Sequence, residues 1–196
     1  MRNLQIAQTP VQGLSTGIID LDTLEKKLLG NAFVKKADLY FSHSGKLHVL
    51  VQQRIPQLRI FNERNQSYYI SDEAEKFPLS NRYTARVIPC SGSISENLER
   101  GGSIQSDLLK SVFQVSSAIE ANDFMKGLVG EIVINENHKI VLVPTIGKAH
   151  ITIGNEENLE EKFKKVKYFY KKVMPRKGWN HYKSINAEFS NQIIAK

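Results

Sequence analysis

Cysteine and long apolar runs are nearly absent from this chain of 196 residues. The single cysteine, Cys90, can form no internal disulfide, and no Cys-x-x-Cys spacing is present to bind a metal or to cycle between redox states. No run approaches the roughly 18 apolar residues of a membrane-spanning helix, and the first residues lack the apolar core of a signal peptide. Apolar residues still make up 41% of the chain, enough for a core. We therefore expect a soluble globular protein of one or two domains.

Patterns that indicate catalysis or metal binding are also missing. The histidines are scattered singly, with none at the i,i+4 spacing of a helical metal site; they are His43, His48, His138, His150 and His181. Ser91-Gly92-Ser93 is neither a nucleophile elbow nor a Ser-x-x-Lys motif, and Gly101-Gly102 lacks the Lys-Ser/Thr of a phosphate loop. Asp72, Glu73 and Glu75 are expected in a solvated turn. The sequence thus predicts a non-enzymatic protein with no cofactor, no metal and no small-molecule substrate.

Positive charge is in excess and unevenly placed. The net charge is +7, and residues 156–196 hold ten Lys/Arg against five Asp/Glu. Within this part, residues 156–173 carry apolar side chains at helical spacing, and most lysines fall off the apolar stripe. The simplest interpretation is a solvated helix face. A nucleic-acid-binding module can show the same Lys- and aromatic-rich helix, so that alternative stays open.

The first part of the chain predicts a helix followed by strands. Asp22-Thr23-Leu24-Glu25 resembles a capping box, and Gly30 ends the short helix. A polar loop over residues 42–45 joins the first two strands as a hairpin. Alternation of apolar residues predicts strands over residues 36–41, 46–53, 58–61, 67–70 and 82–89.

An Arg-Ile-Pro step at residues 54–56 interrupts this strand pattern. Pro56 removes a backbone donor and restricts the residue before it. Arg54 is expected to form an ion pair or a cap beside the break. We therefore predict a junction between two modules, residues 1–56 and 57–196, held by Arg54 and Pro56.

The rest of the chain predicts helices alternating with short strands. Residues 91–106 are rich in Gly and Ser and indicate a long surface connection. A helix is expected from Asp107, where apolar residues repeat at four, three and four positions. Three short strands within residues 127–154, the helix over 156–173, a break at residues 175–178 and a final strand within residues 182–194 complete the prediction.

Several motifs, in this order along the chain, resemble one protein family. Gln53-Arg54-Ile55-Pro56 and the residues before it resemble the second half of a POTRA module. Tyr68-Tyr69-Ile70 and Phe77-Pro78-Leu79 resemble the opening of the β domain of the bacterial cell-division protein FtsQ, also called DivIB. Residues 178–186 and 191–194 resemble its closing strand, in a Bacteroidetes-like form. The resemblance implies an α+β fold: a partial POTRA-like module (helix plus short sheet) over residues 1–56, then a mostly antiparallel β domain with two helices over residues 57–196.

The resemblance also implies a function. Proteins of this family are non-enzymatic divisome scaffolds with one transmembrane helix, a POTRA module and a β domain on the periplasmic side of the inner membrane. Because this chain shows no such helix and only part of a POTRA module, we expect an N-terminally truncated form, attached to the membrane only through the missing helix. The implied partners are FtsB and FtsL, and no nucleic acid is among them.

The family's β domain is understood to bind FtsB, which comes with FtsL, by strand addition at its last regular strand. The matching stretch is Ile185, Asn186, Ala187, Glu188, Phe189, Ser190 and Asn191, with Ile193 beyond it. Phe189 is the expected anchor, and a core position in a final strand is its equal alternative. Glu188 departs from the basic residue of better-known members, so no charge pairing is carried over to it.

The lysines expected to steer an acidic partner segment are Lys164, Lys165, Lys171 and Lys172.

Overall fold

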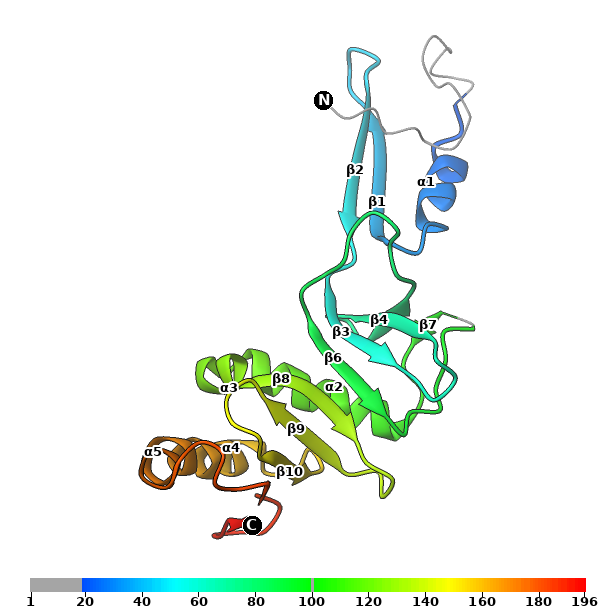
Figure 1. The fold of residues 1–196 in the computed structure, drawn as a ribbon. Helices are drawn as coiled ribbons and strands as arrows, with labels where there is room; N and C mark the ends of the chain where they lie inside the picture. The colour runs from blue at the N-terminus through cyan, green and yellow to red at the C-terminus, as the bar shows by residue number, and fades with distance from the viewer. Residues whose placement is uncertain (1–18, 100) are drawn as a thin grey trace. The chain divides into compact units, whose positions relative to one another are not determined.

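The structure, a computed structural model, describes residues 19–99 and 101–196. The chain divides into two compact units, residues 1–55 and residues 56–196. Figure 1 traces the chain through both units. No helix among the described residues is long and apolar enough to cross a membrane.

In its described residues, 19–55, the first unit is one helix packed on a two-stranded sheet. Helix α1 (Leu21–Leu29) begins at Asp20, whose carboxylate accepts a hydrogen bond from the Thr23 N–H at 3.1 Å, two residues before the predicted cap. Strands β1 (Val34–Phe41) and β2 (Leu47–Gln53) form an antiparallel hairpin. Leu24 of the helix packs with Val34, Ala37 and Leu39 of β1 in a small core. This pattern is the predicted helix plus short sheet.

The second unit is built on a ten-stranded sheet in the order β12-β11-β10-β9-β8-β6-β3-β4-β5-β7. The strands are β3 (Pro56–Phe61), β4 (Ser67–Ser71), β5 (Glu75–Phe77), β6 (Ile88–Gly92), β7 (Gly102–Ser103), β8 (Val129–Ile134), β9 (Ile140–Pro144), β10 (His150–Gly154), β11 (Ser184–Asn186) and β12 (Ile194–Ala195). Neighbours are parallel in the pairs β3–β6, β6–β8 and β10–β11, and antiparallel elsewhere. The predicted α+β class with a mostly antiparallel sheet is confirmed.

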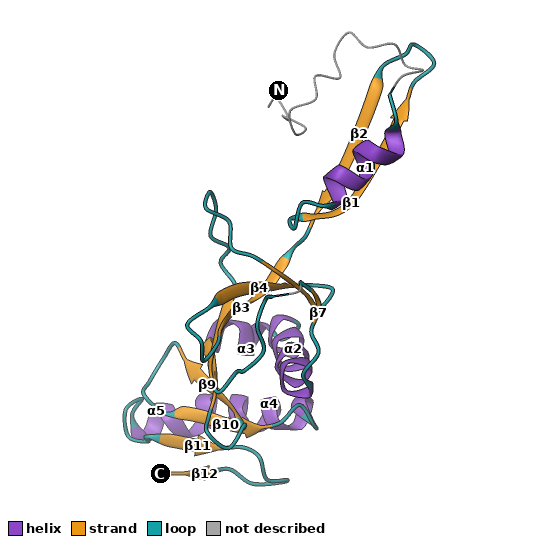
Figure 2. Cartoon of the chain, turned by 90° about the vertical axis from the view of Figure 1, so that its right-hand side faces the viewer, coloured by secondary structure: helices purple, strands orange, loops and turns teal. Residues whose placement is uncertain are grey.

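Helices cover one side of this sheet (Figure 2). They are α2 (Asp107–Glu120), α3 (Asp123–Leu128), α4 (Leu159–Tyr168), a π-helical turn η2 (Phe169–Val173) and α5 (Met174–Lys177). The apolar repeat of α2 is fully buried in the core, at Leu109, Val112, Val115 and Ile119. Both predicted helices are therefore present, and the short α3 was not predicted.

The break predicted at residues 175–178 is present, but it lies at Gly178 and not at Pro175. Instead, α4 runs through η2 into α5, and Pro175 stands at the start of α5, where its missing N–H costs little. The chain turns away only at Gly178, with φ of 100°. The proline thus marks a helix start and not a helix end.

The strand predicted over residues 82–89 starts later than expected. Residues 82–87 are irregular, and the strand begins at Ile88. The Ala85 N–H donates to the Tyr69 hydroxyl at 3.0 Å, so a side chain, and no neighbouring strand, takes up this backbone group. Strand β6 lies between β3 and β8, and its position depends on two partners far away in sequence.

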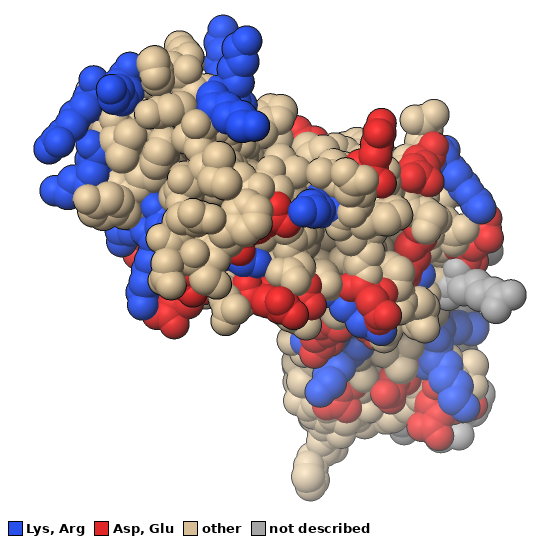
Figure 3. Space-filling model, turned by 90° about the horizontal axis from the view of Figure 1, so that it is seen from below, with Lys and Arg blue, Asp and Glu red and all other residues tan. Residues whose placement is uncertain are grey.

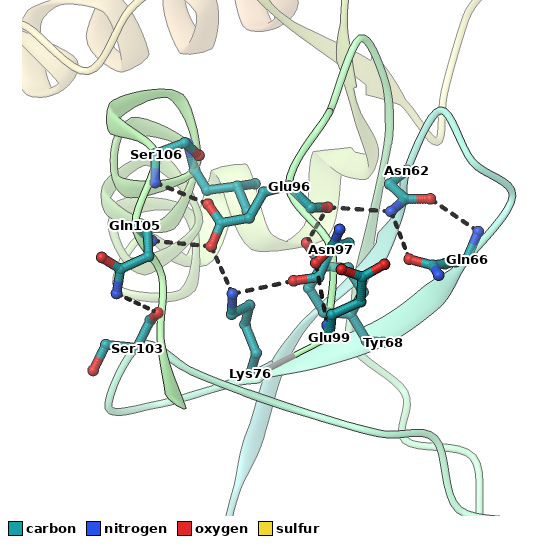
Figure 4. A network of polar contacts seen from close by, with 11 residues as sticks. Asn62, Gln66, Tyr68, Lys76, Glu96, Asn97, Glu99, Ser103, Gln105 and Ser106 are labelled. Carbon is teal, nitrogen blue, oxygen red and sulfur yellow. Dashed lines mark hydrogen bonds and ion pairs between the residues drawn. The ribbon is translucent and has the colours of Figure 1, made fainter. Parts of the chain in front are cut away.

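Residues 91–106 form more than the predicted surface connection. Ile94 and Ile104 are buried in the main core. The backbone carbonyl of Glu96 accepts a hydrogen bond from the Tyr68 hydroxyl at 3.0 Å (Figure 4). The segment is therefore tied to the sheet, which its Gly- and Ser-rich composition does not indicate.

The carboxylate of Glu96 fastens the same segment to the start of α2 (Figure 4). It accepts hydrogen bonds from the backbone N–H groups of Gln105 at 3.0 Å and Ser106 at 2.8 Å, and pairs with Lys76 at 2.9 Å. The Lys76 and Glu96 side chains are only 7% and 10% exposed. Burial opposes ionisation, but hydrogen bonds from Ser106, Lys76 and Gln105 outweigh it and lower the pKa of Glu96.

Candidate partner-binding edge of the sheet

The two ends of the sheet are β12 and β7, each only two residues long (Figure 2). Short edge strands leave few backbone groups open for pairing with another chain. At the C-terminal end, β11 pairs in parallel with β10 and antiparallel with β12, and Ile185 stands opposite Ile151 and Ala195. The outer edge of β11 is therefore occupied by the chain's own last residues.

The final strand is shorter than predicted. The strand expected within residues 182–194 ends at Asn186, and only Ile194–Ala195 returns to pair with it. The Ala187 N–H still donates to the Thr152 carbonyl at 2.9 Å, and the chain then leaves the sheet. Asn191 adopts φ of 61°, a left-handed conformation that no strand contains. Residues 187–193 are therefore a loop between two short strands, called here the C-terminal loop.

Three of the predicted partner-binding residues pack into the main core of the second unit. Ile185 and Ala187 are fully buried in the main core. Ile193 is partly buried and packs against the same core. Their apolar side chains fix both ends of the C-terminal loop to the second unit.

Glu188 makes an internal ion pair. Its carboxylate lies 2.7 Å from Lys139 Nζ and accepts a hydrogen bond from Asn186 Nδ2 at 3.0 Å. Burial raises its pKa, but the hydrogen bonds from Lys139 and Asn186 outweigh that effect and lower the pKa below its ordinary value. The side chain also lies against Gly154, where an added Cβ would come within 2.5 Å of its Oε1. Sequence reasoning missed Lys139, because 49 residues separate it from Glu188 and no local pattern links them.

Phe189 and its neighbours lie over helix α4. The Phe189 carbonyl accepts a hydrogen bond from Lys165 Nζ, and the Asn191 N–H donates to Glu161 Oε1 at 3.2 Å. The Phe189 side chain is 46% exposed. Of the two expectations for this residue, a buried core position does not hold. The loop thus presents a large apolar side chain to solvent while α4 holds its backbone.

The four predicted steering lysines have different surroundings. Lys165 contacts the C-terminal loop and also pairs with Glu161 at 3.3 Å. Lys164 pairs with Glu160 at 2.6 Å on the exposed side of α4. Lys171 and Lys172 are exposed in η2. Only Lys165 therefore touches the predicted binding segment.

A polar hollow of about 440 Å³ lies between the C-terminal loop, α4 and the β9–β10 end of the sheet. Lys139, Lys162 and Lys165 line it together with Glu161 and Glu188. Lys162 is buried and donates to the Asn155 carbonyl at 3.1 Å and to its side-chain oxygen at 2.8 Å, and burial lowers its pKa. Since most of these charges already have partners within the hollow, it fastens the C-terminal loop to α4 and to the sheet.

The described part of the chain shows no cluster of metal-binding side chains, and its cysteine is buried. Residues 19–99 and 101–196 contain no group of three or more His, Cys, Asp or Glu side chains that could hold a metal ion. Cys90 is buried in β6, and burial raises the pKa of its thiol. A thiol kept neutral in this way is a poor nucleophile.

Arg54 and Pro56 stand on either side of the boundary between the units. The Arg54 N–H donates to the Phe33 carbonyl at 2.9 Å, and its Nε donates to the Ala32 carbonyl at 3.1 Å. Both acceptors belong to the first unit, so this arginine fixes the end of β2. Pro56 is the first residue of β3 and stands opposite Ser71.

A family model described as FtsQ/DivIB, C-terminal related, matches residues 55–196. The match starts one residue before β3 and covers all of the second unit. A search among curated proteins finds no match. Proteins of the FtsQ/DivIB family are membrane-anchored cell-division scaffolds. On this match, the chain belongs to the FtsQ/DivIB family and has a role in bacterial cell division.

Proposed function

We propose that this chain is a non-enzymatic divisome scaffold that recruits FtsB, together with FtsL, at the C-terminal end of its sheet. A segment of FtsB adds as a strand to β11 and takes the place of β12. The observation that supports this proposal most is the state of that edge. Strand β12 pairs with β11 at only two positions, Ile194 opposite Asn186 and Ala195 opposite Ile185.

Replacement of β12 costs few interactions. Its backbone bonds to the edge are those of Lys196 with Lys183 and Ser184, besides the two paired positions. Ile194 is already 41% exposed in the free protein, so little additional apolar surface becomes exposed to water when β12 leaves the sheet. A partner strand would supply backbone hydrogen bonds in the same direction, and its alternate side chains would supply specificity.

Phe189 is the proposed anchor beside this edge. An aromatic side chain that is half exposed in the free protein can become buried against a partner and dominate a small interface. Glu188 is not part of the proposed charge recognition, because Lys139 already pairs with it. Lys164, Lys171 and Lys172 would act at longer range and quicken the approach of an acidic segment.

The first unit is proposed to be part of a POTRA module, on its helix and hairpin alone. The proposed location of the chain is the periplasmic side of the inner membrane, where FtsQ-type proteins meet their divisome partners. Arg54 and Pro56 are proposed to hold the junction of the modules, since each fixes the end of one unit.

Titration of the chain with the C-terminal extracytoplasmic segment of FtsB from the same organism tests this function. Saturable binding in calorimetry at tens of micromolar or tighter is the expected result. Circular dichroism of the same sample establishes that the chain is folded. If the folded chain shows no binding in this range, recruitment of FtsB is wrong. If instead it binds an oligonucleotide of mixed sequence with a steep salt dependence, the nucleic-acid alternative holds.

A further inference from the structure

One end of the second unit carries a concentration of positive charge that extends beyond Lys171 and Lys172, the two lysines proposed above to steer the partner segment. Residues 162–187 contain nine Lys/Arg and no Asp or Glu. Figure 3 shows Lys and Arg side chains gathered at the upper left of the molecule, while red and blue side chains mix along the rest of that face. We define the basic tip as the exposed Lys, Arg and Trp residues of η2, α5 and the segment that follows: Lys171, Lys172, Arg176, Lys177, Trp179 and Lys183.

The π-helical turn puts two of these charges side by side. The Met174 N–H donates to the Phe169 carbonyl, five residues back, so the turn holds one residue more than an α-helical turn. Within this turn Phe169 and Tyr170 are both buried, and Lys171 and Lys172 are both exposed. π-Helical turns are frequent at functional sites.

Within residues 19–99 and 101–196, the charges of the basic tip have no ion-pair partner. Among the described residues, no carboxylate forms an ion pair with any of its lysines or with its arginine, whereas Lys164 on the neighbouring α4 pairs with Glu160. Cations at a helix C-terminus are favoured by the helix dipole, which accounts for Arg176 and Lys177. The dipole does not account for Lys183, which lies beyond the helix, nor for the aromatic side chain exposed among these charges.

That aromatic side chain is Trp179, and the structure fixes it in place. Its side chain is 42% exposed, and its ring centroid lies 6.3 Å from that of Tyr170. The loop between β9 and β10 approaches the backbone of this residue, because a Cβ at Gly147 would lie 2.7 Å from the Trp179 carbonyl oxygen. Ile146, next in that loop, is 52% exposed. The tip therefore combines lysines with an amphipathic indole, and an exposed aliphatic side chain lies in the adjoining loop.

This combination matches the chemistry of an anionic bilayer surface. Tryptophan favours the boundary between headgroups and acyl chains, while lysines reach lipid phosphates and bury their apolar stems below. Nucleic-acid recognition relies more on the flat, bidentate guanidinium of arginine, and four of the five cations here are lysines. We propose that the basic tip binds the headgroup region of an anionic phospholipid membrane, with Trp179 at the interface. This activity is separate from strand addition to β11.

Trp179 is the single tryptophan of the chain, so its fluorescence reports directly on the tip. The chain is titrated with vesicles of phosphatidylglycerol and phosphatidylethanolamine, and separately with vesicles of phosphatidylcholine. With the anionic vesicles, and not with phosphatidylcholine, we expect a blue shift of the tryptophan emission and quenching of this emission by brominated acyl chains. Both effects should disappear at high salt. Lys171→Gln with Lys172→Gln is expected to weaken partitioning more than tenfold, because each cation near the surface contributes about fivefold.

The matched control is Lys26→Gln with Lys27→Gln, which removes the same charge from exposed positions of α1. The control pair is expected to leave partitioning and the blue shift unchanged. Equal weakening by both pairs would mean attraction by net charge alone and would overturn the site. Emission that does not shift with anionic vesicles would overturn the proposal as well, and quenching by an oligonucleotide in its place would point to nucleic acid.

Discussion

Lys139 and Glu188 form an ion pair of 2.7 Å that joins the start of β9 to the C-terminal loop. The carboxylate is the more buried partner, and Asn186 supplies it with a further hydrogen bond. Together with the bond from Lys165 to the Phe189 carbonyl, this pair holds the loop beside the edge where we propose that FtsB binds.

Removal of the lysine tests whether this pair holds the loop. We expect Lys139→Ala to cost only about 0.5 kcal/mol of unfolding free energy, because the pair is half exposed and screened by solvent. Amide exchange of residues 187–191 should nevertheless become faster. Lys164→Ala breaks an exposed pair with no contact to the loop and serves as the control. Exchange in the loop that is the same in both variants would show that the pair does not fasten it.

Phe189→Asp tests the proposed anchor. The side chain is 46% exposed, so the variant should keep its stability to within about 0.5 kcal/mol. Binding of the FtsB segment should weaken by more than about thirtyfold, as expected for loss of an interface hot spot with introduction of a charge. Tyr83→Asp is the matched control, since this aromatic side chain of the same unit is 69% exposed. An affinity unchanged by Phe189→Asp would remove Phe189 from the interface.

Deletion of the tail tests whether the partner replaces β12. A chain that ends at Ile193 lacks the residues that pair with β11. If FtsB takes their place, the deletion should raise its affinity about tenfold, because the backbone hydrogen bonds of the tail, three of which involve Lys196, need no longer be broken. Ile194→Ser with Ala195→Ser keeps the backbone and should have a smaller effect. Loss of binding on deletion would instead mean that FtsB pairs with the outer edge of β12.

The pair formed by Lys76 and Glu96 should govern acid stability. We expect Glu96→Ala to cost about 3 kcal/mol, because it leaves the ammonium of Lys76 buried without its partner. Glu99→Ala, in an exposed pair of 3.7 Å with Arg64, should cost about 0.5 kcal/mol or less. Urea unfolding of both variants at neutral pH gives the comparison, and equal costs would contradict the structural role of Glu96.

The pH dependence follows from the lowered pKa of Glu96. The unfolded chain binds the proton near the ordinary value of 4.5, and the folded chain binds it only at lower pH. The stabilisation is thus fully present above 4.5 and is lost as the pH falls through the folded pKa. Glu96→Gln should show a smaller loss of stability over this window than the unchanged chain. An identical pH profile would assign acid unfolding to other carboxyl groups.

Local patterns in the sequence predict much of the fold. The buried repeat of Leu109, Val112 and Ile119 indicates α2, and alternating residues indicate the β1–β2 hairpin. The order of the sheet could not be predicted, because β6 pairs in parallel with β3 and β8, with no short connection to mark either contact. The contacts of Glu96 with Lys76 and Ser106 could not be predicted for the same reason, because these residues are not neighbours in the sequence.

The candidate site shows the same limit. The resemblance pointed to residues 185–191, and a final strand was expected within residues 182–194. The structure ends the strand at Asn186, since Glu188 turns to Lys139 and Asn191 takes a left-handed conformation. Both features depend on contacts with Lys139 before β9 and with α4, and the local sequence pattern does not indicate such long-range contacts.

Amide hydrogen exchange of the chain, with and without the FtsB segment, tests strand addition at β11 most directly. In the free protein, the Ser184 N–H donates to the Lys196 carbonyl and the Lys196 N–H donates to the Ser184 carbonyl. Our account predicts that the partner speeds exchange over residues 194–196 and slows it over residues 184–186. Slower exchange at another edge, with both of these segments unchanged, would contradict the account.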